Sequence, residues 1–393
     1  MTVEGGDTSG GVCRLLVIAD SFPIRPGEGT WRSLFVADFC VALAARGHVV
    51  SVLAPGRPGM QGAFPGVQVE RFGWLGDERV RRLPHAARFG VGSLIQTGDY
   101  FRRGLEVARV EAMRLYPQMT LAVGVYPAGA FTRGLYDLFG IPYSVWTLDG
   151  DLEHYERLWQ RPVVHQIYLQ ASYCGADSNT LAATIARIRD RGCEQWPAAL
   201  TPPPTLPAPR PRPRRFLAVG ALRPEQGFDL LIEAFGLAAP QMPRAELTLH
   251  GDGPEREALM ARAEELRIAS RVRFVPAAGL DACRAEIAAA DALVMPARRA
   301  GVPMVLVDAV NARRPLLVSD AGDLPEVVRE HGVGEIVARD DVDGLADALW
   351  RAYHRGFDVP AGAFERAAAE LSLSSSVDRW DAILGEVLKR RGR

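Results

Sequence analysis

The chain has 393 residues, of which 48% are apolar and 24% charged, and its formal net charge is −1. This length suits two domains better than one hydrophobic core, and the balanced charge excludes a general attraction to nucleic acid. No apolar run approaches the roughly 20 residues of a membrane span, the start does not resemble a signal peptide, and the five cysteines lack metal-site spacing. We therefore expect a cytoplasmic protein without a metal cofactor.

The first half alternates short apolar runs with helical patterns. Residues 13–19 and 49–54 are typical of buried parallel strands. Between them, a loop with Gly27 and Gly29 leads into a predicted helix over 31–46. Further strands are predicted over 121–126 and 143–147, separated by a helix at 128–139. Asp149 and Asp151 follow the last strand, and we expect Asp151 to cap the next helix.

Residues 79–114 combine many arginines with interleaved apolar residues. We favour a pair of surface helices with solvated arginines. The alternative is a patch for an anionic acceptor or a membrane surface, with peripheral binding at the inner membrane face. The eight arginines are Arg79, Arg81, Arg82, Arg88, Arg102, Arg103, Arg109 and Arg114.

Eight prolines between residues 197 and 213 predict a stiff, extended connector that cannot join a sheet. We therefore place the domain boundary here. The first domain covers 1–196, the connector 197–213, the second domain 214–373, and a final helical segment 374–393.

The second half again alternates strands and helices, which predicts a second doubly wound α/β sheet. Strands are predicted over 216–219, 246–250 and 272–275, and helices over 230–237 and 281–290. The stretch 290–326 forms a parallel βαβ unit, with a glycine loop, Pro303 at a helix start, and a second loop at Gly322. Helix starts offer unpaired N–H groups, so this sheet edge suits a phosphate or a sugar hydroxyl.

In order and spacing, these units resemble the family 4 glycosyltransferases, which are retaining nucleotide-sugar enzymes of the GT-B fold with two facing Rossmann-like domains. Gly47-His48-Val49-Val50 and the stretch 173–180 match family patterns. The resemblance implies an acceptor-side first domain and a donor-nucleotide second domain. It also implies that the C-terminal helix packs back on the first domain.

The resemblance also implies a donor site, in which Asp308 takes the place of the glutamate that holds the ribose. The donor-binding residues implied are Gly27, Gly29, Gly220, Gly251, Gly253, Glu255, Arg298, Arg299, Gly301, Asp308, Gly322 and Glu326.

Five positions of that site depart from the family pattern. They are Asp149 for a histidine, Ala221 for an arginine, Gln226 for a lysine, Ala300 for a glutamate and Pro303 for a glycine. Arg223 or the Arg298–Arg299 pair would then supply the missing diphosphate charge, since arginine binds phosphates bidentately. We take Asp149 and Arg223 as the candidate catalytic residues.

Two hypotheses follow from this conflict. The first is a retaining glycosyltransferase with an atypical donor site, acting on a nucleotide sugar and on a saccharide, lipid-linked or small natural-product acceptor. The second is a catalytically inactive homologue that binds a ligand or a partner. Altered phosphate and sugar positions favour the second hypothesis, whereas the glycine loops and Asp308 favour the first.

Overall fold

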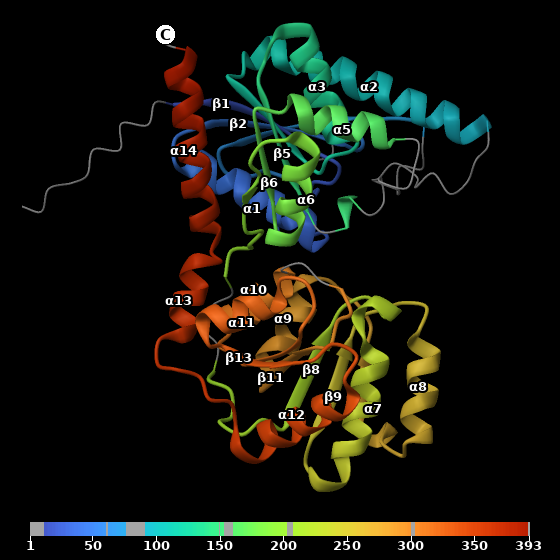
Figure 1. Ribbon diagram of the computed structural model, residues 1–393. Coiled ribbons are helices and arrows are strands. Elements are labelled where there is room, and N and C mark those ends of the chain that lie inside the picture. The colour runs from blue at the N-terminus through green and yellow to red at the C-terminus, as the bar shows by residue number, and fades with distance from the viewer. Residues whose placement is uncertain are drawn as a thin grey trace, which may run out of the picture. The chain divides into compact units, whose positions relative to one another are not determined.

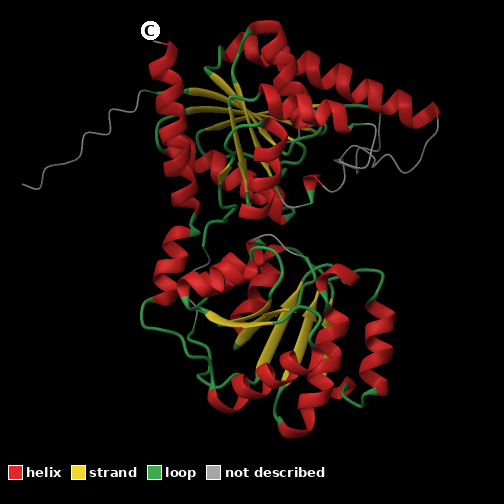
Figure 2. Ribbon diagram, in the orientation of Figure 1, coloured by secondary structure: helices red, strands yellow, loops and turns green. Residues whose placement is uncertain are grey.

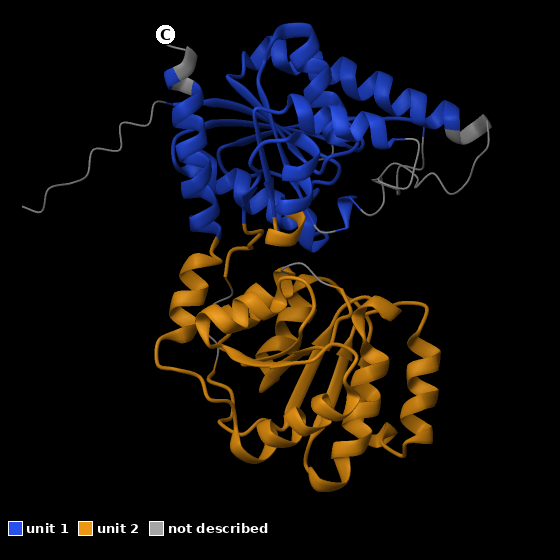
Figure 3. Ribbon diagram, viewed as in Figure 1, with its two compact units in different colours: residues 1–176, 182–196, 373–393 blue, residues 177–181, 197–372 orange. Residues whose placement is uncertain are grey.

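The structure is a computed structural model that describes residues 12–59, 62–75, 91–148, 150–152, 160–202, 207–299 and 303–391. Its contacts divide the chain into two compact units (Figure 3). The first contains Met1–Ala176, Ala182–Trp196 and Leu373–Arg393, and the second contains Asp177–Leu181 and Pro197–Ser372. In each unit a parallel sheet lies between two layers of helices (Figure 2).

The first unit has a seven-stranded sheet of order β3-β2-β1-β4-β5-β6-β7, in which all neighbours are parallel. The strands are β1 (Arg14–Ala19), β2 (Val49–Pro55), β3 (Val67–Phe72), β4 (Met119–Val123), β5 (Tyr143–Thr147), β6 (Tyr173–Ala176) and β7 (Glu194–Gln195). The strand order reverses between β1 and β4. In doubly wound sheets, ligands bind outside the carboxyl ends of the strands at such a reversal.

Six described helices cover this sheet (Figure 1). They are α1 (Trp31–Ala45), α2 (Val91–Leu115), α3 (Ala128–Phe139), α5 (Arg161–Gln170), α6 (Asn179–Arg189) and α14 (Leu373–Arg391). The last helix joins this unit through Trp380, which is fully buried against Phe39 and Trp196. Asp381 of the same helix pairs with Arg46 and His48 at the end of α1. Aromatic burial and charge therefore both fix α14 to the first unit.

The second unit has a six-stranded parallel sheet of order β10-β9-β8-β11-β12-β13. The strands are β8 (Arg215–Val219), β9 (Glu246–His250), β10 (Val272–Val275), β11 (Ala292–Met295), β12 (Leu316–Ser319) and β13 (Gly334–Val337). The helices are α7 (Phe228–Ala238), α8 (Arg256–Glu265), α9 (Leu280–Ala289), α10 (Met304–Asn311), α11 (Leu324–His331), α12 (Val342–Arg355) and α13 (Ala363–Glu370). The order reverses between β8 and β11, which marks a second candidate ligand edge.

The described part of the proline-rich segment is held on the second unit by charged side chains. Arg284 donates to the carbonyl of Thr201 at 2.7 Å, and the buried Arg314 donates to that of Pro207 at 2.9 Å. The buried carboxylate of Asp291 accepts from the backbone N–H of Arg214 at 2.9 Å. The described part of this segment makes no strand pairing, because prolines have no N–H to donate.

The arginine-rich region forms one continuous helix, α2, over its described part, and Arg79 to Arg88 lie outside the described residues. Within α2, Asp99 accepts from Arg102 at 3.0 Å and from Arg103 at 2.8 Å. Glu111 likewise accepts from Arg114 at 2.8 Å. These arginines are paired on their own helix, in keeping with a solvated surface. Among the described residues, every helix is too short or too polar to cross a membrane.

Candidate functional site

Most of the predicted donor-binding residues lie at one place, the carboxyl edge of the second sheet. Gly220 follows β8, Gly251 follows β9, Arg298 follows β11 and Gly322 follows β12. These strands are neighbours around the reversal between β8 and β11. The sequence prediction therefore selects residues that the fold brings to a single edge.

Two of the glycines permit a close approach between the loops that follow β8 and β9. A Cβ on Gly251, whose φ is +157°, would lie 1.8 Å from the carbonyl oxygen of Gly220. A Cβ on Gly253 would lie 2.3 Å from the carbonyl oxygen of Leu222. No other residue type fits at either position without moving the backbone. These glycines shape the edge by letting its loops pack together.

Arg223 lies in the turn after β8, directly before the short 3₁₀ helix Pro224–Gln226. Its side chain is exposed, and its guanidinium makes no hydrogen bond or ion pair with any residue that the structure describes. Gln226 stands where the family pattern has a lysine. It lies beside Gly220, because a Cβ on Gly220 would be 2.9 Å from the Oε1 of Gln226. Arg223 is therefore a cation at this edge whose guanidinium donors are not taken up by any described residue.

The guanidinium of Arg298, by contrast, is hydrogen-bonded to other residues of the same unit. Its Nη1 and Nη2 donate to the two carboxylate oxygens of Asp229 at 2.8 and 2.7 Å, and its Nε donates to Asp340 at 2.7 Å. Its Nη1 also donates to the carbonyl of Pro224 at 2.6 Å. Burial alone would raise the pKa of Asp229, but the hydrogen bond and charge of Arg298 outweigh it and lower that pKa. Arg298 thus fastens loops together, which leaves it less suited than Arg223 to a diphosphate.

Of the other predicted site residues Arg299, Asp149, Ala300 and Gly301, the structure describes only Arg299. Arg299 is exposed. Asp149, Ala300 and Gly301 lie outside the described residues. Their roles in the donor site therefore remain predictions.

Glu255 lies at the same edge, in the loop after β9 and directly before α8. Its Oε2 is buried and has no hydrogen-bond partner among the described residues. Burial raises its pKa, Asp229 and Glu225 raise it further, and Arg298 opposes them. A carboxyl group with a raised pKa at a ligand edge is a candidate functional group.

We expect Glu255→Gln to stabilise the protein at alkaline pH and to have no effect at acidic pH. A raised carboxyl pKa means that ionisation is harder in the folded protein, so stability is lost as pH rises from the ordinary value of 4.5 through the folded pKa. Because Glu255 is partly exposed, the gain should stay below about 1 kcal/mol. Thermal unfolding at pH 4 and pH 8 tests this, with Glu257→Gln on the same helix as control. An equal shift at both pH values would contradict the assignment.

Asp308 lies on the fifth residue of α10 and is almost completely buried, with 1% of its surface exposed. Both of its carboxylate oxygens accept from Arg284 of α9, from Nε at 2.8 Å and from Nη2 at 3.1 Å. Arg284 was not among the predicted site residues, because nothing in the sequence connects it to a carboxylate 24 residues away. The predicted ribose ligand is thus one half of a bidentate ion pair.

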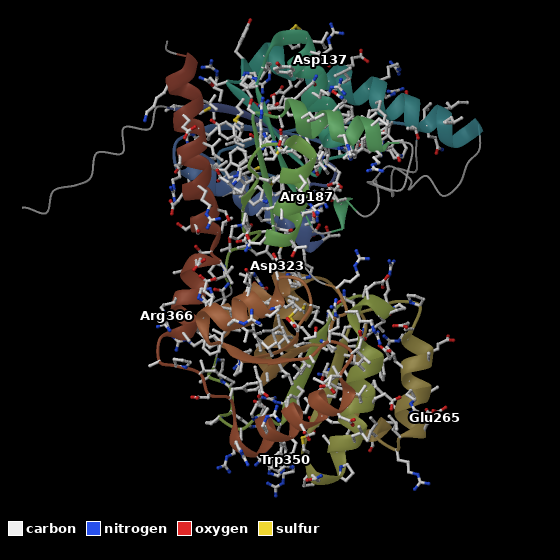
Figure 4. The ribbon with its side chains drawn as sticks, viewed as in Figure 1. Asp137, Arg187, Glu265, Asp323, Trp350 and Arg366 are labelled. Carbon is white, nitrogen blue, oxygen red and sulfur yellow. The ribbon has the colours of Figure 1, made fainter. Side chains whose placement is uncertain are left out.

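The last predicted residues, Gly322 and Glu326, flank the start of α11. Asp323, labelled in Figure 4, precedes this helix and is buried. Its carboxylate accepts from the backbone N–H groups of Asn179 and Thr180, and Glu326 accepts from the Asn179 side chain at 2.9 Å. This end of the edge therefore anchors the segment Asp177–Leu181 within the second unit.

The first unit has a charged cluster at its own strand-order reversal. Arg32 of α1 donates to both oxygens of Asp151, at 2.7 and 3.1 Å, and its Nε lies 3.3 Å from Asp20, which follows β1. The Arg32 guanidinium packs where a Cβ on Gly124, after β4, would lie. The carboxylate of Asp151 thus holds Arg32 at the edge. Its expected role as a helix cap stays a prediction, because residues 153–159 lie outside the described residues. Gly27 and Gly29 belong to the loop that precedes α1.

Two other features lie away from these edges. A cavity of about 400 Å³ opens at the first residues of β8, β9 and β10, the opposite edge of the second sheet. Glu330, His331 and Glu370, at the ends of α11 and α13, place one ligand atom each within 4.8 Å of one another. Two of these three side chains are exposed, as is common for acidic groups that bind nothing.

Comparison with known proteins finds a family match that lies within the second unit. Residues 213–355 match the family described as glycosyl transferases, group 1. The chain is 33% identical over 190 residues to a glycogen synthase of Mycobacterium tuberculosis, covering 48% of this chain and 43% of that protein. It is 30% identical over 140 residues to a GDP-mannose-dependent phosphatidylinositol monomannoside mannosyltransferase of the same species, covering 34% and 36% of the two chains. The chain thus matches less than half the length of these relatives.

Solved structures are similar over nearly the whole chain. Sucrose-phosphate synthase from Thermosynechococcus elongatus has a TM-score of 0.71 at 17% identity and covers 96% of this chain and 100% of its own. HepE from Anabaena, in complex with UDP and glucose, has a TM-score of 0.67 at 16% identity and covers 95% and 100%. The fold is therefore GT-B, with two parallel-sheet α/β domains, as the sequence predicted.

Proposed function

We propose that the protein is a retaining glycosyltransferase that binds a nucleotide-sugar donor at the carboxyl edge of the second unit. The observation that carries this proposal is that the family match and the candidate ligand edge fall in the same segment of the chain. The segment that matches the group 1 glycosyl transferases, residues 213–355, contains the strand-order reversal where the glycine loops and Asp308 meet. Glycine loops and helix starts at such an edge suit a diphosphate.

In this proposal the donor site is atypical, because its positive charge comes from Arg223 and not from positions 221 and 226. Arg223 faces the diphosphate, because its guanidinium is exposed and makes no bond with a described residue. Arg298 keeps the turn after β8 in place through Asp229 and Pro224. Leaving-group stabilisation then depends on arginine and backbone N–H groups, without a metal ion.

The acceptor is a saccharide, a lipid-linked molecule or a small natural product, and we assign it to the first unit. The carboxylates of Asp20 and Asp151, both held by Arg32, lie at the strand-order reversal of that unit. Carboxylates that are fixed in place suit hydroxyl-bearing molecules, because each oxygen accepts more than one hydrogen bond. Contact of α2 with a membrane surface stays a prediction for lipid-linked acceptors.

A second candidate function is that of an inactive homologue that binds a ligand or partner. It is favoured by Ala221 and Gln226, which carry no charge at the positions of the family's arginine and lysine. A binding screen of UDP-, GDP- and ADP-sugars, followed by a donor-hydrolysis assay on each hit, separates the two functions. Binding with turnover supports the transferase, whereas binding without turnover supports the inactive homologue. The absence of any binding contradicts the transferase and leaves the partner-binding form of the inactive homologue.

A further inference from the structure

The ends of α11 and α13 bring a histidine and two carboxylates to one point of the second unit. Glu330 and His331 are the last two residues of α11, and Glu370 is the last residue of α13. These two helices pack against each other (Figure 1). One ligand atom from each of the three side chains lies within 4.8 Å of the other two. Ligand atoms around one zinc ion are at most about 4.4 Å apart, so small side-chain rotations would bring all three to a single ion.

The histidine of this group is buried and has no hydrogen-bond partner. Val327 and Val328 lie on the buried face of α11, and His331 follows them by four and three residues, so it shares that face and is only 7% exposed. Its Nε2 lies 3.8 Å from Oε2 of Glu370, which is too long for a hydrogen bond. His331 makes no hydrogen bond with any residue in the described part of the chain. Because buried polar groups are usually satisfied, this imidazole points to a missing ligand.

The two carboxylates also lack the arginine partners that most acidic groups of this fold have. Glu330 and Glu370 make no ion pair with an arginine among the described residues. Arg366, labelled in Figure 4, lies four residues before Glu370 on α13, the spacing at which a pair would form. It donates instead to the carbonyl of Ala361 at 3.3 Å. Two neighbouring carboxylates without a cation repel each other, and a divalent ion would remove that repulsion.

We propose that Glu330, His331 and Glu370 bind a zinc ion, with water as the fourth ligand. Zinc takes imidazole nitrogen and carboxylate oxygen in tetrahedral geometry, and three protein ligands leave one position for water. The imidazole favours zinc over magnesium and calcium, which take oxygen ligands. The expectation of a protein without a metal came from the spacing of the cysteines, and this site contains none.

The ion would have a structural role, separate from the proposed donor site. Helix α11 begins after β12 at the carboxyl edge of the sheet and ends, at His331, shortly before β13 begins at the opposite edge. Glu370 lies two residues before Ser372, the last residue of the second unit. A bound ion would therefore fasten the end of α13 to α11 directly before the chain enters α14.

The test measures zinc binding by the full chain after dialysis against a chelator. Calorimetry with zinc chloride should show one ion per chain, and zinc should raise the thermal unfolding midpoint. Glu370→Gln should raise the Kd for zinc at least about 10-fold, because loss of even an outer-shell partner costs 10–100-fold in metal affinity. The zinc-dependent shift of the midpoint should shrink accordingly. Magnesium chloride should give no such shift in the parent protein.

The choice of variants keeps the test valid if one of them does not fold. Glu330→Gln and Glu370→Gln change exposed side chains and should fold like the parent protein. His331→Gln changes a buried residue, so its fold is checked by circular dichroism before its zinc affinity is measured. The matched controls are Glu365→Gln, at the start of α13, and His354→Gln, an exposed histidine of α12. Both controls should keep the zinc affinity of the parent protein.

Three results would overturn the proposal. The first is a parent protein that binds no zinc in calorimetry. The second is zinc binding that Glu330→Gln, His331→Gln and Glu370→Gln all leave unchanged, since the ion would then lie elsewhere. The third is equal affinity for zinc and magnesium, which would mean that the carboxylates alone attract cations. No nucleotide enters these measurements, so their outcome is independent of the proposed function.

Discussion

Replacing Arg223 with alanine is expected to lower kcat/KM for a nucleotide-sugar donor by about 10²–10³-fold, the usual effect of losing one charge-stabilising donor. Arg223 is exposed in the turn after β8, and its guanidinium has no partner among the described residues. Its removal breaks no hydrogen bond in this part of the fold. The thermal unfolding midpoint should therefore stay within about 1 °C of the parent value, since surface changes away from such features cost little.

Two comparison variants sharpen this prediction. Arg244→Ala removes an exposed arginine that precedes β9, at the opposite edge of the same sheet, and should leave turnover unchanged. Arg298→Ala should lower the unfolding midpoint as well as turnover, because it leaves Asp229 and Asp340 without their ion-pair partner. Full activity of Arg223→Ala in a donor-hydrolysis assay would remove Arg223 from the proposed mechanism.

Much of the fold could be predicted because its signals are local. The strands expected at 246–250 and 272–275 coincide with β9 and β10, since each is a short run that ends at a glycine or proline loop. The strand expected at 121–126 is displaced to Met119–Val123 in β4. Met119 and Thr120 are fully buried in the sheet, although neither belongs to an obvious apolar run.

The helix α2 shows how packing overrides a local signal. The pair of helices expected in residues 79–114 stays a prediction, because residues 79–90 lie outside the described residues. Val91–Leu115 form one helix that contains Gly98 and Gly104. Glycine usually weakens a helix interior. At Gly104, however, the Phe131 ring of α3 lies 2.4 Å from where a Cβ would be, so close packing between the helices requires glycine.

The ion pairs of the candidate sites could not be predicted, for a different reason. Nearly all 46 basic residues are arginine, and they face 47 acidic residues, so each carboxylate has many equivalent partners in the sequence. Arg298 pairs with Asp229 across 69 positions, and Arg32 pairs with Asp151 across 119. Only the topology decides these pairs. The sequence therefore predicted which glycine loops lie together at this edge of the sheet, but not which arginines the carboxylates of the fold pair with.

The last prediction separates an active enzyme from an inactive homologue. Changing Ala221→Arg, Gln226→Lys and Ala300→Glu together restores the charges typical of the family. If the donor site has been rebuilt around Arg223 and Arg298, we expect the triple variant to lose at least about 10²-fold in turnover, the usual effect of displaced catalytic groups. An inactive homologue would instead gain affinity for a nucleotide sugar.

The physical reason lies in the turn after β8. The backbone N–H of Arg298 donates to the carbonyl of Glu225 at 2.8 Å, and its side chain is held by Asp229 at 2.7 Å. Two new cations at positions 221 and 226 would compete for that carboxylate and release Arg298, which loosens the loop that Arg223 depends on. Donor affinity and turnover should be measured side by side for the parent protein and the triple variant. A parent protein that neither binds nor hydrolyses any sugar donor, together with a triple variant that does both, would show that the native donor site is inactive.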